Sequence, residues 1–146
     1  MKVETSLNSI LTSKSRAKLL SIFFCQPRES FYVRQLVRLT GEEINSVRRE
    51  LENLKKINLL LSERRGNRIY YTTNLNHHLF NSLLLLAYRN SDLAKKLENS
   101  KLLLASFSFL LWQKKRSDAI DLIIVGDQPL REVEKAVEAE EKKRDA

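Results

Sequence analysis

The sequence predicts an α+β fold that is mostly helical, with a β-hairpin in its first half and a small α/β segment at its end. Apolar residues recur every three or four positions in residues 42–56, which indicates one face of an amphipathic helix. Residues 59–73 then form two short stretches around a turn that contains Gly66, a pattern typical of a β-hairpin. In residues 102–143, two apolar runs precede another helical pattern.

The first helix is expected over residues 14–25. Ser13 supplies a side chain that can cap its N-terminus, and Pro27 ends it because proline cannot continue a helix. The side of this helix expected to be buried comprises Ala17, Leu20, Ile22, Phe23 and Phe24. A short amphipathic turn is expected before the helix, at Leu7, Ile10 and Leu11.

A pair of helices joined by a glycine-containing turn comes next. Residues 31–33 are expected to be extended, residues 34–39 to form a short helix, and Thr40-Gly41 to form part of the turn. The helix expected over residues 42–56 begins with glutamates and ends with lysines, which suits the helix dipole. Its apolar face comprises Ile44, Val47, Leu51 and Leu54, and the other side carries Asn45, Ser46, Arg48, Arg49 and Glu52.

The hairpin follows a sharp exit from this helix. Asn58 stands where a left-handed backbone conformation is needed, which asparagine tolerates. The strands are expected at residues 59–64 and 68–73, on either side of Arg65-Gly66-Asn67. The side chains expected to pack against the helices are Leu60, Ile69 and Tyr71.

The order helix, turn, helix, hairpin predicts a winged helix-turn-helix, in which the second helix lies in the major groove of DNA. Residues 1–74 contain 14 Lys and Arg against 7 Asp and Glu, whereas residues 75–146 contain 12 against 11. A basic half beside a nearly neutral one is typical of a protein that binds a polyanion at one end. A basic surface also maintains solubility, so charge alone does not decide between these interpretations.

The candidate DNA-binding residues lie on the outward side of the second helix, on the hairpin and at the start of the first helix. Asparagine pairs with adenine and arginine with guanine, while serine contacts bases or phosphate. Hairpin arginines reach phosphates or the adjacent minor groove. For each arginine taken singly, a solvated surface charge is the better interpretation, and the DNA-binding interpretation depends on the whole set in this order. The complete set is Tyr32, Arg34, Gln35, Asn45, Ser46, Arg48, Arg49, Arg64, Arg65, Asn67 and Arg68.

Residues 31–41, 46–54 and 63–71 resemble the ArsR-type winged helix-turn-helix transcriptional regulators of prokaryotes. The likeness is closest to those ArsR-type regulators in which a nucleotidyltransferase-like domain follows the winged helix in the sequence. It implies a dimeric DNA-binding transcription factor, with residues 1–90 as the DNA-binding domain and its dimerisation helix. A homodimer is also expected because the helix at residues 76–89 has apolar residues around more than half its circumference and needs burial on more than one side.

The last third of the chain, residues 91–146, is expected to form a small α/β segment. A short helix or linker at 91–99 precedes strands at 102–111 and 119–125 and a helix at 130–143. Both strands are continuous apolar runs, which is typical of strands covered on both faces.

This segment resembles the beginning of the minimal nucleotidyltransferase fold in a degenerate form. Ala105-Ser106 stands where that family has Gly-Ser, and Asp121 matches the second aspartate of its Asp-x-Asp metal-binding motif. Ala119 occupies the position of the first aspartate. Asp118 is three positions from Asp121, so the two side chains point to opposite faces of a strand, whereas a magnesium site needs converging ligands. We therefore expect the segment to be catalytically inactive and to serve packing or dimerisation.

Other classes of function are less favoured by the sequence. A nucleotidyltransferase-like enzyme or nucleotide-sensing protein is the alternative, and a winged fold used only for protein contacts is a third interpretation. No catalytic residue, cofactor or metal site is expected, because Cys25, His77 and His78 share no ligand spacing and the three glycines form no phosphate loop. The single cysteine favours the cytoplasm. The N-terminus lacks an apolar signal core and the apolar runs are too short to span a bilayer, so no membrane association is expected.

Overall fold

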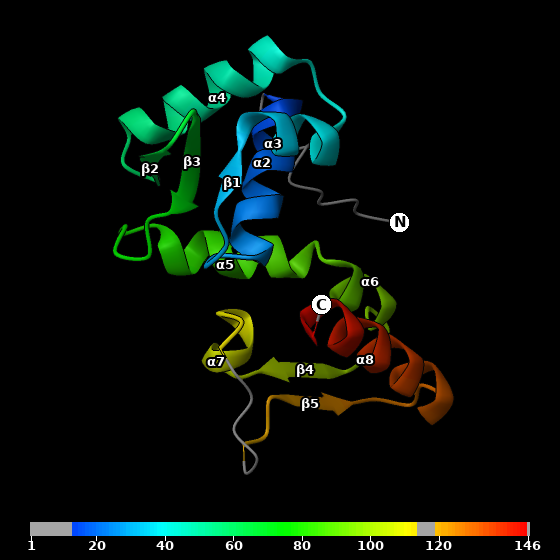
Figure 1. The fold of residues 1–146 in the computed structure, drawn as a ribbon. Coiled ribbons are helices and arrows are strands. Elements are labelled where there is room, and N and C mark those ends of the chain that lie inside the picture. The colour runs from blue at the N-terminus through cyan, green and yellow to red at the C-terminus, as the bar shows by residue number, and fades with distance from the viewer. Residues whose placement is uncertain (1–12, 114–118, 146) are drawn as a thin grey trace. The chain divides into compact units, whose positions relative to one another are not determined.

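The computed structural model describes residues 13–113 and 119–145. These residues have an α+β fold, as predicted, in which helices predominate and both small sheets are antiparallel. The chain divides into two compact units, Met1–Ala87 and Tyr88–Ala146 (Figure 1), whereas the sequence was expected to divide between residues 90 and 91. The turn expected at Leu7, Ile10 and Leu11 and the side chain of Asp118 lie outside the described residues.

The first unit combines helices with a three-stranded sheet of order β1-β3-β2. Helix α2 begins directly after Ser13, as predicted, because the Ser13 hydroxyl accepts a hydrogen bond from the Arg16 backbone N–H at 3.2 Å. The elements of this unit are α2 Lys14–Cys25, β1 Phe31–Tyr32, α3 Val33–Thr40, α4 Ile44–Lys56, β2 Leu60–Arg65, β3 Arg68–Thr73 and most of α5 Phe80–Arg89.

Aromatic side chains of α2 form the centre of the first unit. Phe23 is fully buried and meets Phe31 of β1 edge to face, with ring centroids 5.4 Å apart. Phe24 is also fully buried and lies 5.7 Å from the ring of Phe80 in α5. The predicted buried side of α2 is confirmed for Ala17, Leu20, Phe23 and Phe24, whereas Ile22 is half-buried and the unpredicted Leu19 is fully buried.

Helix α5 begins at Phe80, four residues after its predicted start at Asn76. Asn74 forms a turn first, because its side-chain Oδ1 accepts from the Asn76 N–H and its backbone oxygen accepts from the His77 N–H, both at 3.1 Å. One side of α5 is buried at Phe80, while Leu85 on another side is 60% exposed.

The second unit contains a two-stranded sheet packed on helices. Its buried centre consists of Leu93, Leu97 and Ala136. Leu103 of β4 and Ile124 of β5 pack against this centre. The elements of the unit are α6 Asp92–Lys96, β4 Leu102–Ala105, α7 Phe107–Leu110, β5 Leu122–Val125 and α8 Leu130–Asp145.

Two predictions for the second unit are wrong. The strand predicted over residues 102–111 ends at Ala105, because the Ser106 hydroxyl accepts from the Phe109 N–H at 3.0 Å and caps α7. The strands are also covered on one face and not, as predicted, on both. The prediction failed because an apolar run indicates burial without showing how many faces of the strand are covered. The outer face carries Leu102, Leu104, Ile123 and Val125, each between 46% and 49% exposed.

An ionic network fixes the end of α8. Arg144 donates hydrogen bonds to Glu140 Oε1 at 2.9 Å, to the backbone oxygen of Phe109 at 2.7 Å and to the Tyr88 hydroxyl at 2.9 Å. The Trp112 indole N–H donates to the same hydroxyl at 2.8 Å. The side chains of Arg144 and Glu140 are only 15% and 10% exposed, so this ion pair is largely withdrawn from water.

Candidate nucleic-acid interface

A three-residue turn joins α3 to α4. Gly41 adopts the left-handed conformation at φ +65° and ends α3, with its N–H donating to the Val37 oxygen at 2.9 Å. The Thr40 hydroxyl donates to the Leu36 oxygen at 2.7 Å and accepts from the Glu42 N–H at 3.2 Å. These local bonds set the direction in which α4 leaves the turn.

Helix α2 holds this turn through Glu42. Lys18 Nζ donates to Glu42 Oε1 at 2.6 Å and to the Thr40 oxygen at 2.7 Å, and the Ser15 hydroxyl donates to Glu42 Oε2 at 3.1 Å. The hydrogen bond from Lys18, followed by that from Ser15, lowers the pKa of the Glu42 carboxyl below its ordinary value. The turn is therefore anchored by an ionised carboxylate.

A second carboxylate, Glu50, anchors α4 itself. It is 3% exposed and accepts from Arg16 Nε at 2.8 Å and from the Ser13 hydroxyl at 3.1 Å. Burial alone would raise the pKa of Glu50, but the hydrogen bonds from Arg16 and Ser13 outweigh it and hold the pKa below its ordinary value. Neither anchor is predicted by the sequence, because the pairs join residues far apart in the chain.

These contacts decide which side of α4 faces outward. Val47 and Leu51 are fully buried and Leu54 is 3% exposed, so the predicted apolar face is confirmed, with Ile44 half-buried at its margin. Ser46 is half-buried, and its backbone N–H donates to the side chain of the N-cap residue Glu43 at 3.3 Å. The side chains exposed as predicted are Asn45, Arg48, Arg49 and Glu52.

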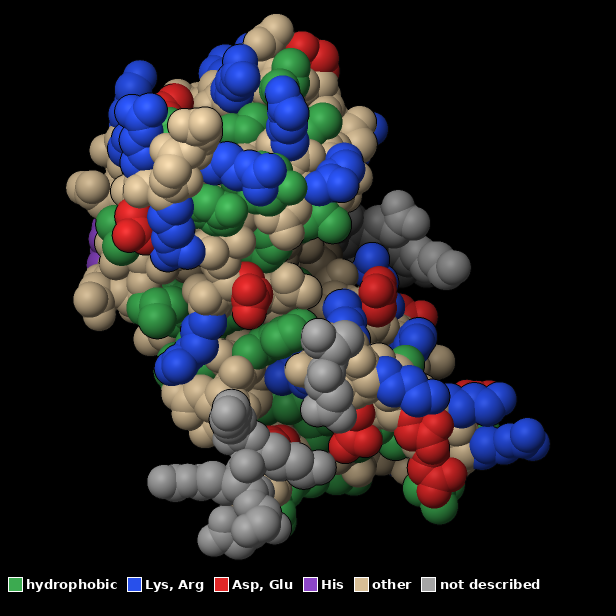
Figure 2. All heavy atoms as spheres, in the orientation of Figure 1, with side chains coloured by type: hydrophobic (Ala, Val, Ile, Leu, Met, Phe, Trp, Pro, Cys, Tyr) green, Lys and Arg blue, Asp and Glu red, His purple; other side chains and the backbone are tan. Residues whose placement is uncertain are grey.

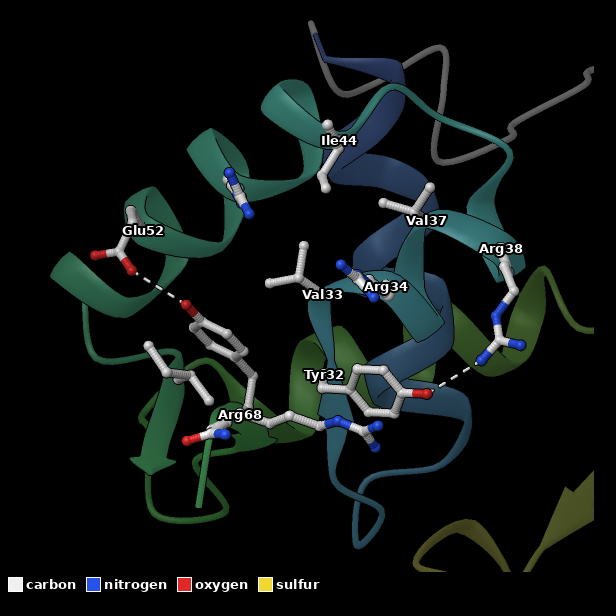
Figure 3. Close-up of a pocket in the computed structure, with 12 residues that line it drawn as sticks. Tyr32, Val33, Arg34, Val37, Arg38, Ile44, Glu52 and Arg68 are labelled. Atoms are coloured by element: carbon white, nitrogen blue, oxygen red, sulfur yellow. Dashed lines mark hydrogen bonds between the residues drawn. The ribbon is translucent and has the colours of Figure 1, made fainter. Parts of the chain in front are cut away.

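A groove of about 1130 Å³ lies between α3, α4 and the β2–β3 hairpin (Figure 3). Its apolar lining includes Ile69, which is 47% exposed, so the prediction that Ile69 packs against the helices is wrong. Ile69 shares a strand face with the buried Tyr71 but lies closer to the hairpin tip, where it lines the groove and stays partly open to solvent. The other apolar lining residues are Val33, Val37 and Ile44, and the basic ones are Arg34, Arg38, Arg48 and Arg68.

The three hairpin arginines have different surroundings. Arg64 Nε donates to the Gly66 oxygen at 3.4 Å, within a two-residue turn in which Gly66 has φ +58°. Arg65 forms an ion pair with Glu63 at 2.7 Å. Arg68 places its guanidinium carbon 4.7 Å from the ring centroid of Tyr32. Arg65 is therefore partly neutralised, whereas the other two are not paired with an acid in the described part of the chain.

Arg38 lines the groove but is not among the predicted residues. Its Nη2 donates to the Tyr32 hydroxyl at 3.1 Å, and it lies one helical turn after Arg34 in α3. That spacing was the available signal, because residues four apart share one side of a helix. Gln35 is half-buried and does not line the groove, unlike its neighbour Arg34.

Positive charge dominates this face. Figure 2 shows Lys and Arg side chains gathered over the visible side of the first unit, with apolar side chains between them. Of the described residues that line the groove, Glu52 alone is acidic, and it accepts from the Tyr71 hydroxyl at 3.2 Å. Burial, followed by the charge of Glu52, raises the pKa of Tyr71, so this phenol stays protonated and keeps donating.

The groove brings together five of the eleven predicted residues, and the rest lie elsewhere. The five are Tyr32, Arg34, Arg48, Asn67 and Arg68. Those outside the groove lining are Gln35, Asn45, Ser46, Arg49, Arg64 and Arg65. Asn45 and Arg49 are exposed on α4, and Arg64 and Arg65 lie at the end of β2.

Ser106 and Asp121 of the second unit are also in contact. The Ser106 hydroxyl donates to Asp121 Oδ1 at 2.8 Å, and the Ser106 N–H donates to the Asp121 backbone oxygen at the same distance. The Asp121 carboxylate is therefore already bonded to a side chain of the protein. This bond ties the start of α7 to the residue before β5.

No protein-family model matches the chain, and no curated protein matches its sequence. Within the described ranges, no three His, Cys, Asp or Glu residues are grouped as metal ligands would be. His77 and His78 stack on each other, with ring centroids 4.4 Å apart, and Cys25 is half-buried near the Ala87 backbone oxygen. Among the helices of residues 13–113 and 119–145, none has the length and hydrophobicity needed to cross a bilayer.

Proposed function

We propose that this protein is a sequence-specific DNA-binding transcriptional regulator whose first unit is a winged helix-turn-helix. In this proposal α3 and α4 are the two helices of the motif, the β2–β3 hairpin is the wing, and the exposed side of α4 enters the major groove. The second unit has a packing or dimerisation role and no catalytic one.

The observation that carries the proposal is the contrast between the two sides of α4. Its inner side is held by apolar packing and by the buried Glu50, whereas the exposed side carries Asn45, Arg48 and Arg49. The arginines of α3, α4 and the hairpin that form no ion pair with a described carboxylate are Arg34, Arg38, Arg48, Arg64 and Arg68. Unpaired guanidinium groups suit phosphate and base edges, and the apolar lining of the groove suits sugars and thymine methyl groups.

Replacement of Arg48 or Arg49 by alanine tests the proposed reading of bases. A preferred duplex is first selected from a random pool, and binding is then followed by fluorescence anisotropy. Each variant is expected to lose about 1–3 kcal/mol of preference for the selected site if its arginine contacts a guanine. Wild-type affinity is expected to fall steeply as salt rises from about 50 to 200 mM, because phosphate contacts release counterions.

Lys101→Ala serves as the matched control, because Lys101 is an exposed cation of the second unit that pairs with Asp127 at 2.6 Å. It is expected to bind as the wild type does. Two outcomes would contradict the proposal: absence of salt-dependent binding to any duplex, or unchanged selectivity in both Arg48→Ala and Arg49→Ala.

We propose further that the regulator acts as a homodimer. Apolar side chains that remain uncovered support this, because surfaces of this kind mark protein contacts. Leu79 and Leu85, before and within α5, are 44% and 60% exposed, and the outer face of the β4–β5 sheet is about half exposed. A dimer would place two α4 helices about 34–36 Å apart, one turn of DNA, on a pseudo-palindromic site.

Sedimentation equilibrium of the full chain is expected to give twice the monomer mass at micromolar concentration. Leu85→Glu is expected to give monomers, because it places a charge within the apolar contact of α5. Glu134→Gln, at an exposed position of α8, is the control and should leave the mass unchanged. A monomeric wild type would contradict the dimer, and a dimeric Leu85→Glu would exclude α5 as its interface.

A further inference from the structure

Tyr32 stands at the junction of the helices and the hairpin. It ends β1 and is the N-cap residue of α3. Its hydroxyl accepts from Arg38 Nη2 at 3.1 Å, and its ring lies under Arg68, 4.7 Å from the guanidinium carbon. Figure 3 shows Arg34, Arg38 and Arg68 around this one side chain, although they come from α3 and β3.

A second tyrosine supports the ring of Tyr32. Tyr70 is its partner in the β1–β3 register, and the two rings meet edge to face with centroids 5.7 Å apart. Arg65 lies over the ring of Tyr70 at 5.2 Å. The strand pairing therefore fixes the position of Tyr32, and Tyr32 in turn fixes two arginines.

Arg38 and Arg68 have partners of a different kind from those of Arg16 and Arg144. Arg16 and Arg144 are held by the carboxylates of Glu50 and Glu140, which neutralise them. Arg38 and Arg68 are instead held by a neutral phenol, which restricts the side chain and leaves the charge available. Ordering a free arginine side chain costs rotamer entropy, so a guanidinium that is already positioned binds an anion at a smaller entropic cost.

The chemistry of the expected ligand follows from this arrangement. A guanidinium matches the geometry of phosphate oxygens, and the Tyr32 hydroxyl occupies only one of the five N–H donors of Arg38. Three guanidinium groups, two from α3 and one from β3, suit a row of several phosphates better than a single anion. Resting on the proposed DNA binding, we infer that Tyr32 positions Arg38 and Arg68, beside Arg34, to bind the phosphodiester backbone of one DNA strand.

A double-mutant cycle tests the hydroxyl of Tyr32. Tyr32→Phe keeps the ring and is expected to weaken binding to a random duplex about 2- to 5-fold, as Arg38 loses its hydrogen bond. Arg38→Ala is expected to weaken binding more and to reduce the slope of log affinity against log salt by about 0.9, because one phosphate contact is lost. In the Arg38→Ala background, Tyr32→Phe should have no further effect, because the hydroxyl acts through Arg38.

A second cycle tests the ring. Tyr32→Leu removes the ring and is expected to bind about 2- to 5-fold more weakly than Tyr32→Phe, because Arg68 also loses its support. This additional loss should be absent in the Arg68→Ala background. Arg89→Ala, which removes an exposed arginine at the end of α5, is the charge-matched control and should bind as the wild type does.

The outcomes separate this inference from the function on which it rests. If the wild type binds duplexes and Tyr32→Phe binds equally well, the positioning role is refuted and the proposed function stands. If Tyr32→Phe causes the same loss with and without Arg38, Tyr32 acts independently of Arg38 and the inference is wrong. If the wild type does not bind duplexes, both fail. Thermal unfolding midpoints equal to that of the wild type would show that the variants are folded.

Discussion

Replacement of Arg144 by alanine is expected to unfold the second unit. Arg144 connects the end of α8 to Glu140, to the backbone of Phe109 and to the hydroxyl of Tyr88. Its guanidinium carbon also lies 3.5 Å from the centroid of the Phe109 ring. Alanine removes all of these contacts together, because each of them uses the same guanidinium.

The expected magnitude comes from the burial of the ion pair. Glu140 is 10% exposed, so the variant leaves a nearly buried carboxylate without its cation. Removal of one partner of a buried pair costs about 3–5 kcal/mol. A unit of about 60 residues has roughly 3–9 kcal/mol of stability, so this loss is comparable with the whole.

Trp112 provides the measurement, because it is the only tryptophan in the sequence and belongs to this unit. In the absence of denaturant, the Trp112 fluorescence of Arg144→Ala is expected to resemble that of the denatured wild type. The circular dichroism spectrum of the variant should still show the helices of the first unit. Arg131→Ala, at an exposed position of the same helix, should unfold as the wild type does. A cooperative Trp112 transition at the wild-type midpoint in Arg144→Ala would contradict this account.

Replacement of Arg16 by alanine is expected to lower the free energy of unfolding of the first unit by about 2–3 kcal/mol. Glu50 is only 4% exposed at its side chain and would lose its nearer cation, since its other partner, Arg49, lies at 4.0 Å. The loss should be smaller than at Arg144 because Arg16 is 35% exposed and water partly replaces it. Denaturant unfolding followed by circular dichroism gives the value. Lys14→Ala, which removes an exposed cation of the same helix, is the control.

The carboxyl groups of Glu42 and Glu50 predict how the stability of the first unit depends on pH. The pKa values of Glu42 and Glu50 are lowered from 4.5, so the folded chain binds their protons less readily than the unfolded chain does. Their contribution is fully present above pH 4.5 and is lost as the pH falls through the lower folded-state values. Unfolding free energy should therefore decrease below pH 4.5, and less steeply in Arg16→Ala. Parallel decreases in both proteins would show that Glu50 does not contribute.

Local signals in the sequence predicted local structure well. Ser13 caps α2, and the spacing of Val47, Leu51 and Leu54 identified the buried face of α4. Asn58 has φ +57° at the end of α4, as its position indicated. Each of these features depends on residues within a few positions of one another, so a short stretch of sequence is enough to predict it.

Features that depend on distant residues were missed. Arg16 and Glu50 are 34 positions apart, and the contact of Tyr32 with Arg68 depends on the pairing of β1 with β3. The end of β4 was also missed, because Ser106 caps a helix within an apolar run that reads equally well as strand. For the candidate site, residue type identified most of the basic side chains, but not their partners.

In the proposed function, the exposed side of α4, the start of α3 and the β2–β3 hairpin together bind duplex DNA. The most direct test is to record backbone amide chemical shifts of the labelled full chain while a selected duplex is added. The largest changes in chemical shift are expected at Asn45, Arg49 and Arg68, and the amides of β4 and β5 should change little. Chemical-shift changes confined to the second unit would contradict DNA binding by this surface. Changes at the buried residues of α4 without changes at its exposed residues would contradict it as well.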